Sequence, residues 1–287
     1  MVFYSLMKRR KTSRVKSKAV YKYKIDEWER ENWNSTFSFD SENYGTEVIP
    51  FTYYERPGVL QLIDYLINLG IKGNKIYHIR SDVNYTSRYE KTEKYEDCFL
   101  EYEIDEIFVV KDYRACIKGH VFVRNDKNEI VIAQTDYFYA IIDDFFINEY
   151  INKNNINSLE SVYDQIKDEE GILCRQKDWK RSFPICKGFG YEYAQLSGDY
   201  NPWHCSESLF KPLRKGKKAY IQGYCILNII IKTMFEEISD DVRSISMSIK
   251  DKVYTQQDIH LLFNNERYEI LDDEGKLLVY GDVKTGR

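Results

Sequence analysis

The sequence predicts an α+β fold in which two antiparallel sheets each wrap around a long central helix. Two segments are apolar around most of their circumference, as buried helices are: residues 57–70, with Pro57 in the first turn and Gly70 at the end, and residues 223–238. Each segment is followed by runs that alternate as strands do. The same order of one helix and several strands therefore occurs twice, which predicts two similar units.

The strands are expected where aromatic and β-branched residues alternate with polar ones. The chain has 25 Tyr and 15 Phe among 287 residues, and these residue types favour strands. In the first half the expected strands are residues 75–84, 96–107, 113–124 and 129–142, with a hairpin turn at 125–128. In the second half they are residues 243–253, 258–270 and 276–283, with a turn at 272–275.

Three parts follow from this order. We expect an N-terminal unit over residues 1–142, a polar connector over 143–172 and a C-terminal unit over 173–287. A basic arm at 8–18 opens the first unit. A solvated terminus is the stronger explanation of that arm, and a grip on a phosphate-rich or acidic partner is the alternative.

Composition limits the classes of partner and compartment. A net charge of −4 gives no general case for binding nucleic acid. No stretch is long and apolar enough to span a membrane, and no signal peptide is readable at the start, so we expect a cytoplasmic protein. The cysteines lack the spacing of a disulfide framework or a zinc site, which predicts free thiols and no metal: Cys98, Cys116, Cys174, Cys186, Cys205 and Cys225.

The chemistry is expected in one loop, which reads Ser197-Gly-Asp-Tyr-Asn-Pro-Trp-His204. Asp199 and His204 lie on either side of Asn201-Pro202, a dipeptide that commonly forms a turn. A compact loop could therefore direct a carboxylate and an imidazole into one pocket, where they would form an acid/base pair. An Asx turn and an ordinary loop histidine are the alternative.

A second segment supplies a complementary group. It reads Ala219-Tyr-Ile-Gln-Gly-Tyr-Cys225 and opens the apolar helix at 223–238. The first turn of a helix has free backbone N–H groups, and Gly223 would let a ligand oxygen approach them closely. An oxyanion hole is predicted at Gly223.

These two segments resemble a known family. The first is similar to the S-G-D-x-N-P-x-H signature of MaoC-like dehydratases and (R)-specific enoyl-thioester hydratases, and the second to their P-I-A-H-G-M segment. Gln222 stands where that segment has His, and Tyr224 where it has Met. The resemblance implies a double hotdog fold, a catalytic dyad of Asp199 and His204, and a thioester oxygen bound by the Gly223 N–H. Ser197, Asn201, Gln222 and Tyr224 would shape the loop or contact the substrate.

The implied reaction interconverts (3R)-hydroxyacyl and trans-2-enoyl thioesters, as in fatty acid or polyketide metabolism, with no cofactor. The partner would be acyl-CoA or an acyl carrier protein, and a homodimer stays open. Setting Gly223 on Gly58 puts Asn34 near the place of Asp199 and Phe39 near that of His204, so the first unit has no dyad. Two other functions remain: a non-catalytic acyl-thioester-binding or partner subunit, and a hotdog thioesterase.

Other candidates have ordinary explanations. His78, His120 and His260 lie in strand patterns, where a structural histidine is expected. Cys205 could be a nucleophile, but the family needs no thiol. The cations at 211–218 could bind the phosphates of a thioester carrier, and a plain exposed loop explains them equally well.

Overall fold

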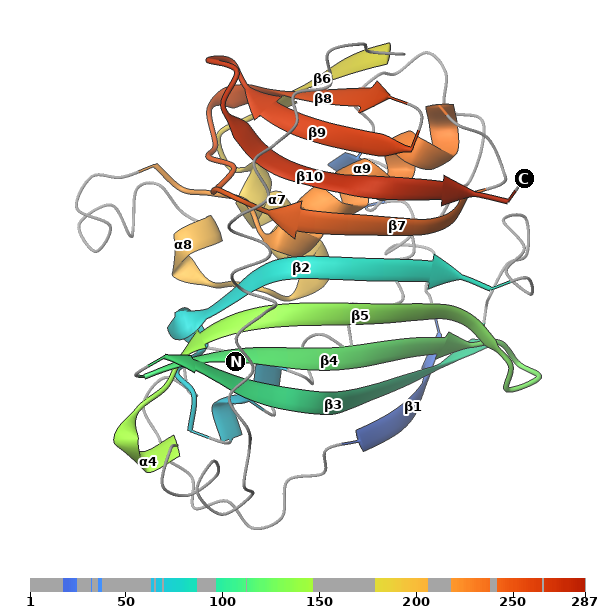
Figure 1. The fold of residues 1–287 in the computed structure, drawn as a ribbon, viewed down its shortest axis with the longest axis vertical. Coiled ribbons are helices and arrows are strands. Elements are labelled where there is room, and N and C mark those ends of the chain that lie inside the picture. Colours follow the sequence, from blue (N-terminus) through green and yellow to red (C-terminus); the bar gives the residue numbers. More distant parts are fainter. Residues whose placement is uncertain are drawn as a thin grey trace.

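The protein is built on one antiparallel sheet of ten strands, in the order β1-β3-β4-β5-β2-β7-β10-β9-β8-β6 (Figure 1). The computed structural model describes residues 18–24, 32, 36–37, 63–64, 66–68, 70–86, 97–111, 113–146, 179–205, 218–237, 242–264 and 266–286. The strands of the first half are β1 (Lys18–Lys24), β2 (Ile76–Tyr85), β3 (Asp97–Lys111), β4 (Arg114–Arg124) and β5 (Ile130–Ile141). Those of the second are β6 (Trp179–Ile185), β7 (Val242–Ile249), β8 (Gln257–Asn264), β9 (Arg267–Asp272) and β10 (Leu277–Thr285).

Both halves have the same topology. From the outer edge to the centre, each runs through its first, third, fourth, fifth and second strand. The halves join where β2 pairs antiparallel with β7, from Arg80 opposite Ser248 to Asn84 opposite Ser244. The two expected sheets therefore meet edge to edge and form a single continuous sheet.

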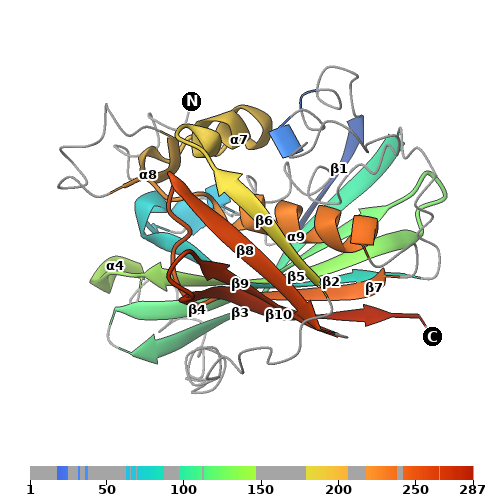
Figure 2. The same ribbon diagram turned by 90° about the horizontal axis from the view of Figure 1, so that it is seen from above.

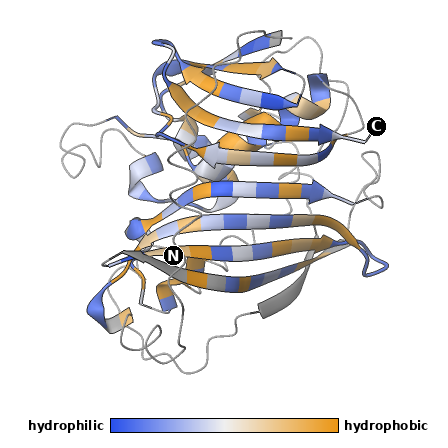
Figure 3. Ribbon diagram, in the orientation of Figure 1, coloured by the Kyte–Doolittle hydropathy of each residue, from blue (hydrophilic) through white to orange (hydrophobic). Residues whose placement is uncertain are grey.

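The central helix of the second half is α9 (Gly223–Glu237), which begins where predicted. Figure 2 shows it on the concave side of the sheet, with α7 (Phe189–Ser197) farther out on the same side. Its apolar residues are almost fully buried, among them Leu227, Ile230 and Met234 at 0% exposure. Figure 3 shows hydrophobic and hydrophilic residues alternating along the strands. This alternation is expected when one side of a sheet is buried, because successive side chains point to opposite sides. This packing fixes the N-terminus of α9 close to the seam between the halves.

The short helices are η1 (Gly73–Lys75), α4 (Asp144–Phe146) and α8 (Pro202–Cys205). The expected helix at 57–70 is described at residues 63–64 and 66–68, which are helical, and Leu66 is fully buried. The rest of that helix, the basic arm before Lys18 and the connector after Phe146 lie outside the described residues. Among the described residues, no helix is long and apolar enough to cross a membrane.

Most expected strands match the structure, and one prediction was wrong. Residues 258–270 form two strands, β8 and β9, which pair as a hairpin from Asn264 opposite Arg267, and the sequence between these two residues has no glycine or proline to signal a turn. Strand β6 was missed. It contains Pro184, which argues against a central strand, but β6 lies at the edge of the sheet, where a missing N–H donor is tolerated.

The expected turns are present. At 125–128 the Asn128 N–H donates to the Asn125 carbonyl at 2.9 Å, and Asn128 has a left-handed φ of 62°. At 272–275 the Gly275 N–H donates to the Asp272 carbonyl at 3.0 Å, and Gly275 has a φ of 80°. Asn and Gly are the residues that adopt this conformation at least cost.

Candidate active site

The motif loop is held by its own polar side chains. Helix α7 ends at Gly198, whose N–H donates to the Ala194 carbonyl and whose φ of 75° turns the following chain out of the helix. The Ser197 hydroxyl then accepts the Asp199 N–H at 3.2 Å, and Asp199 Oδ1 accepts the Asn201 N–H at 3.2 Å. These are the local turns that Ser and Asp favour. They orient the Asp199 carboxylate through residues close to it in the sequence.

Asn201 caps the next helix. Its Oδ1 accepts the Trp203 N–H at 3.2 Å, and its carbonyl accepts the His204 N–H at 2.9 Å. Pro202 occupies the first position of α8, where a proline is well tolerated. One turn of helix therefore places His204 facing back toward Asp199.

The two predicted catalytic side chains are close together. His204 Nε2 lies 4.0 Å from Asp199 Oδ2. The side chain of His204 is 11% exposed and that of Asp199 is 31% exposed. The separation is longer than a hydrogen bond, and catalytic contacts often tighten only when substrate binds. A ligand that lies next to Nε2 and Oδ2 can contact both the imidazole and the carboxylate.

The hydrogen bond of the other ring nitrogen, Nδ1, defines which tautomer His204 adopts. Its Nδ1 lies 2.7 Å from the Tyr220 carbonyl, which can only accept, so Nδ1 carries the hydrogen. Nε2 then presents a lone pair on the side of Asp199. Burial lowers the pKa of His204, and this outweighs the opposing effects of Asp199 and of the bond to Tyr220. His204 is thus prepared to accept a proton at Nε2.

We expect the acidic limb of the pH profile of kcat/KM to lie below the ordinary histidine value of about 6.5. The pKa of His204 is lowered, so the proton that blocks Nε2 binds only at a lower pH. The unfolding free energy should also fall as pH drops below about 6.5, because the unfolded chain binds that proton first. Comparing His204→Asn with the unaltered protein isolates this histidine from the other three. An acidic limb above pH 6.5 would contradict the assignment.

Gln222 directly precedes α9, and its side chain binds both α7 and the motif loop. It is 2% exposed, and its Nε2 donates to the Gly190 carbonyl at 3.0 Å and to the Asp199 carbonyl at 3.3 Å. The residue that departs from the family pattern is therefore a buried amide that fixes the backbone of Asp199.

Gln222→Leu is expected to lower the free energy of unfolding by about 1–3 kcal/mol, because it removes the side chain that donates to both carbonyls. Any turnover that depends on Asp199 should fall with it, since the Asp199 backbone loses a support. Gln222→His, which retains a donor, should keep activity within about tenfold, roughly 1.4 kcal/mol. Chemical denaturation and kcat measured on both variants test this. A leucine variant with unchanged stability and turnover would rule out the role.

Gly190 allows α7 to approach the loop. A Cβ at this position would lie 2.4 Å from the His204 carbonyl oxygen, far inside any normal contact. Gly190 therefore sets how closely α7 approaches the backbone of His204.

Gly223 begins α9 close to these residues. Gln222, which binds the Asp199 carbonyl, directly precedes it, and Tyr220, which binds His204, lies three residues before it. Gly223 is partly exposed, and its N–H belongs to the first turn of a helix with no acidic residue there. The dyad and the predicted oxyanion donor thus lie on adjoining pieces of backbone.

Sequence reasoning gave His78 only a structural role, and the structure places it at this site. Its ring stacks on Tyr224, with centroids 4.2 Å apart and planes at 15°, and its Nδ1 would lie 2.5 Å from a Cβ at Gly223. His120 and His260 have hydrogen bonds on both ring nitrogens, as structural histidines do. No sequence signal distinguished His78, because its contacts with Gly223 and Tyr224 join it to the other half of the chain.

Two further candidates can be placed. Burial raises the pKa of the Cys205 thiol to about 12, and its Sγ donates to the Asp199 carbonyl, so it is a poor nucleophile. Of the cations at 211–218, only Lys218 is described, and it is exposed. Among the described residues, no three His, Cys, Asp or Glu side chains are grouped as metal ligands.

No protein-family model matches the sequence, and no curated protein does. Solved structures are similar in fold. The full-length peroxisomal multifunctional enzyme type 2 from Drosophila melanogaster matches with a TM-score of 0.61 and 13% identity, over 93% of this chain and 48% of that one. A MaoC-like dehydratase from Phytophthora capsici matches with a TM-score of 0.64 and 13% identity, over 94% and 96%. The 12:0-ACP thioesterase from Umbellularia californica matches with a TM-score of 0.54 and 11% identity, over 95% and 98%.

These similarities define a class of fold. The chain has a hotdog fold, and MaoC-like dehydratases share it. This chain spans about half the length of the Drosophila enzyme and nearly the whole of the Phytophthora dehydratase. Thioesterases share the fold as well, so the fold alone leaves the reaction open.

Proposed function

We propose that the protein is a dehydratase or hydratase that interconverts (3R)-hydroxyacyl and trans-2-enoyl thioesters. The observation that carries the proposal is the approach of His204 Nε2 to Asp199 Oδ2, 4.0 Å apart and close to the N-terminus of α9. The loop from Ser197 to His204 matches the S-G-D-x-N-P-x-H motif at every defined position, while the segment that opens α9 departs from the family pattern at Gln222 and Tyr224. The hotdog fold, shared with MaoC-like dehydratases, agrees with it.

The difficult step of dehydration is removal of the Cα proton. That proton becomes acidic only when negative charge can move onto the thioester oxygen. The Gly223 N–H and the positive end of the α9 dipole would stabilise the oxygen, and one such donor is typically worth about 10²–10³ in rate.

The dyad would move the protons. His204 Nε2 starts with a lone pair and can take the proton from Cα as the C–C double bond forms and the C3–O bond breaks. The departing hydroxyl needs one proton to leave as water, and the pair can return the proton it has just accepted. Because the two groups share one task, we assign it to the pair rather than to either residue.

We propose a division of the chain that follows from the repeated strand order. Residues 1–142 would be a first hotdog without a dyad, 143–172 a connector and 173–287 the catalytic hotdog, which together make a double hotdog. The common topology of the two halves supports this division. Ser197, Asn201 and Gln222 would shape the catalytic loop, and Tyr224 would line the site.

The thioester carrier would be coenzyme A or an acyl carrier protein. Both carry phosphate. Lys252 lies near His204, with its ammonium 4.6 Å from the centre of the Tyr220 ring, and it is exposed. A cation at this place could attract the phosphates of either carrier.

A hotdog thioesterase is the second candidate, since the 12:0-ACP thioesterase has a similar fold. Both reactions need an oxyanion donor, but they differ in what is released. The test is an assay of short enoyl thioesters on coenzyme A and on acyl carrier protein. We expect loss of the enoyl absorbance and no free thiol. Free thiol would indicate the thioesterase, and binding without any turnover would indicate a non-catalytic acyl-binding subunit.

A further inference from the structure

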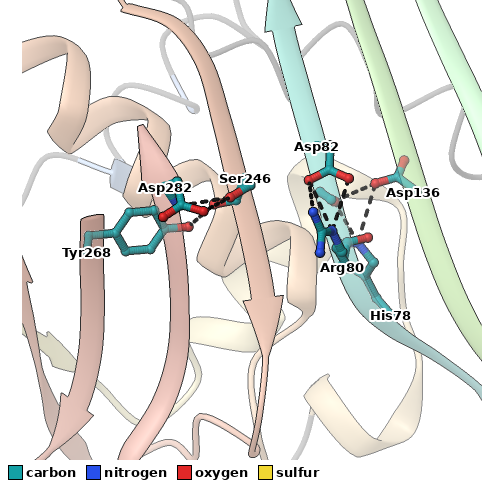
Figure 4. Close-up of polar contacts among 8 residues, drawn as sticks. His78, Arg80, Asp82, Asp136, Ser246, Tyr268 and Asp282 are labelled. Atoms are coloured by element: carbon teal, nitrogen blue, oxygen red, sulfur yellow. Dashed lines mark hydrogen bonds and ion pairs between the residues drawn. The ribbon is translucent and has the colours of Figure 1, made fainter. Parts of the chain in front are cut away.

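His78 belongs to the first half of the chain, where the sequence predicts no dyad, yet it contacts the beginning of α9. In Figure 4 it lies on β2, and Asp136 extends from the neighbouring strand β5. Its side chain is only 7% exposed. The stack on Tyr224 and the approach to Gly223 place the ring against the proposed oxyanion donor.

A β-bulge gives the ring this direction. The register of β2 against β5 shifts between His78 and Arg80, so that His78 pairs with Phe138 and Ser81 with Asp136. In a regular strand, residues three apart point to opposite faces, but the extra residue brings His78 and Ser81 to the same buried face. Bulges of this kind often redirect a side chain at a functional site.

The buried polar groups around His78 define which ring nitrogen carries hydrogen. Nε2 lies 3.1 Å from the Arg80 carbonyl, which can only accept, so the hydrogen is on Nε2. Nε2 also lies 2.7 Å from the Ser81 hydroxyl, which donates in turn to Asp136, and Gln134 donates to the same carboxyl group. Ser81 and Asp136 are fully buried. This network holds the ring in one orientation and one tautomer.

The other nitrogen is left unpaired. Nδ1 is buried and has no hydrogen-bond partner among the described residues. A buried acceptor without a donor is unfavourable, and native proteins keep few of them. Nδ1 lies against Gly223, where an added Cβ would be 2.5 Å from it, beside the backbone N–H proposed to bind the thioester oxygen.

We propose that His78 Nδ1 accepts a hydrogen bond from the C3 hydroxyl of the bound hydroxyacyl thioester, or from the water that becomes this hydroxyl. This inference rests on the proposed function and adds a specificity-determining residue to it. The thioester group and a saturated chain have no O–H donor, whereas the oxygens on C1 and C3 of a hydroxyacyl group lie within reach of each other. The Gly223 N–H would donate to the oxygen on C1, and His78 Nδ1 would accept from the hydroxyl on C3. His78 would thus select hydroxyacyl over plain acyl ligands.

The test measures binding instead of turnover. In an Asp199→Asn background, calorimetry compares a (3R)-hydroxyacyl thioester with the saturated acyl thioester of the same length, which lacks only the hydroxyl. With His78 present, the hydroxyacyl ligand should bind about tenfold more tightly, the typical value of one buried hydrogen bond. His78→Phe keeps a ring to stack on Tyr224 and should remove the preference without weakening the saturated ligand. His78→Asn, which can place an oxygen near the position of Nδ1, should restore part of it.

The outcomes separate the two proposals. An equal preference in His78→Phe, or a loss of affinity for both ligands alike, would overturn the role of His78 and leave the dehydratase proposal intact. If neither thioester binds the Asp199→Asn protein with His78 in place, the proposed function itself is overturned. Dehydration of the ligand at the rate of the unaltered protein would overturn the role of Asp199 instead.

Discussion

Asp199→Asn and His204→Asn are each expected to lower kcat for hydration by about 100-fold or more, the low end of general acid–base contributions. Asn at 199 can still accept the Asn201 N–H, and Asn at 204 can still donate to the Tyr220 carbonyl, so both variants preserve the loop. What they lose is the carboxylate or Nε2. The measurement is kcat with a short enoyl thioester, with circular dichroism to confirm folding.

The double variant tests whether the two residues act as a pair. Because they share one proton-transfer task, it should lose little more than the slower single variant. Affinity for a saturated acyl thioester should persist in all three, since Gly223 is unchanged. Turnover near that of the unaltered protein in either single variant, or losses that multiply as for independent residues, would contradict the dyad.

Gly190→Ala is expected to reduce turnover strongly although Gly190 contacts no substrate in the proposed mechanism. The added Cβ would lie 2.4 Å from the backbone oxygen of His204, and a backbone atom cannot move aside as a side chain can. Either α7 or α8 must shift, and overpacking of this kind typically costs about 1–3 kcal/mol of stability. The shift moves His204 away from Asp199, so kcat should fall more than affinity for substrate.

Glu192→Ala is the matched control, because Glu192 is an exposed residue two positions along the same helix. It should leave kcat and the melting temperature nearly unchanged. The comparison uses thermal unfolding, kcat and KM for both variants. A Gly190→Ala protein with normal stability and normal kcat would show that α7 does not constrain the position of His204.

Much of the fold could be predicted from local patterns. Alternation of side chains located strands β2 to β5, β7 and β10, and the all-round apolar segment located α9, because burial imposes those periods directly on the sequence. The division of residues 258–270 into β8 and β9 could not be predicted, since their turn has no glycine or proline. The pairing of β2 with β7 could not be predicted either, because no local sequence pattern shows which strands far apart in the chain will pair.

The candidate site divides in the same way. By itself the sequence determined the loop from Ser197 to His204 and the glycine at the start of α9, because the turns, caps and free N–H groups there depend on residues close together in the chain. Only the tertiary structure decided that Gln222 supports the Asp199 backbone, that Gly190 limits the approach of α7, and that His78 lies against Gly223. These contacts join segments that are separated in sequence, and the contact of His78 with Gly223 exists only once the two halves share one sheet.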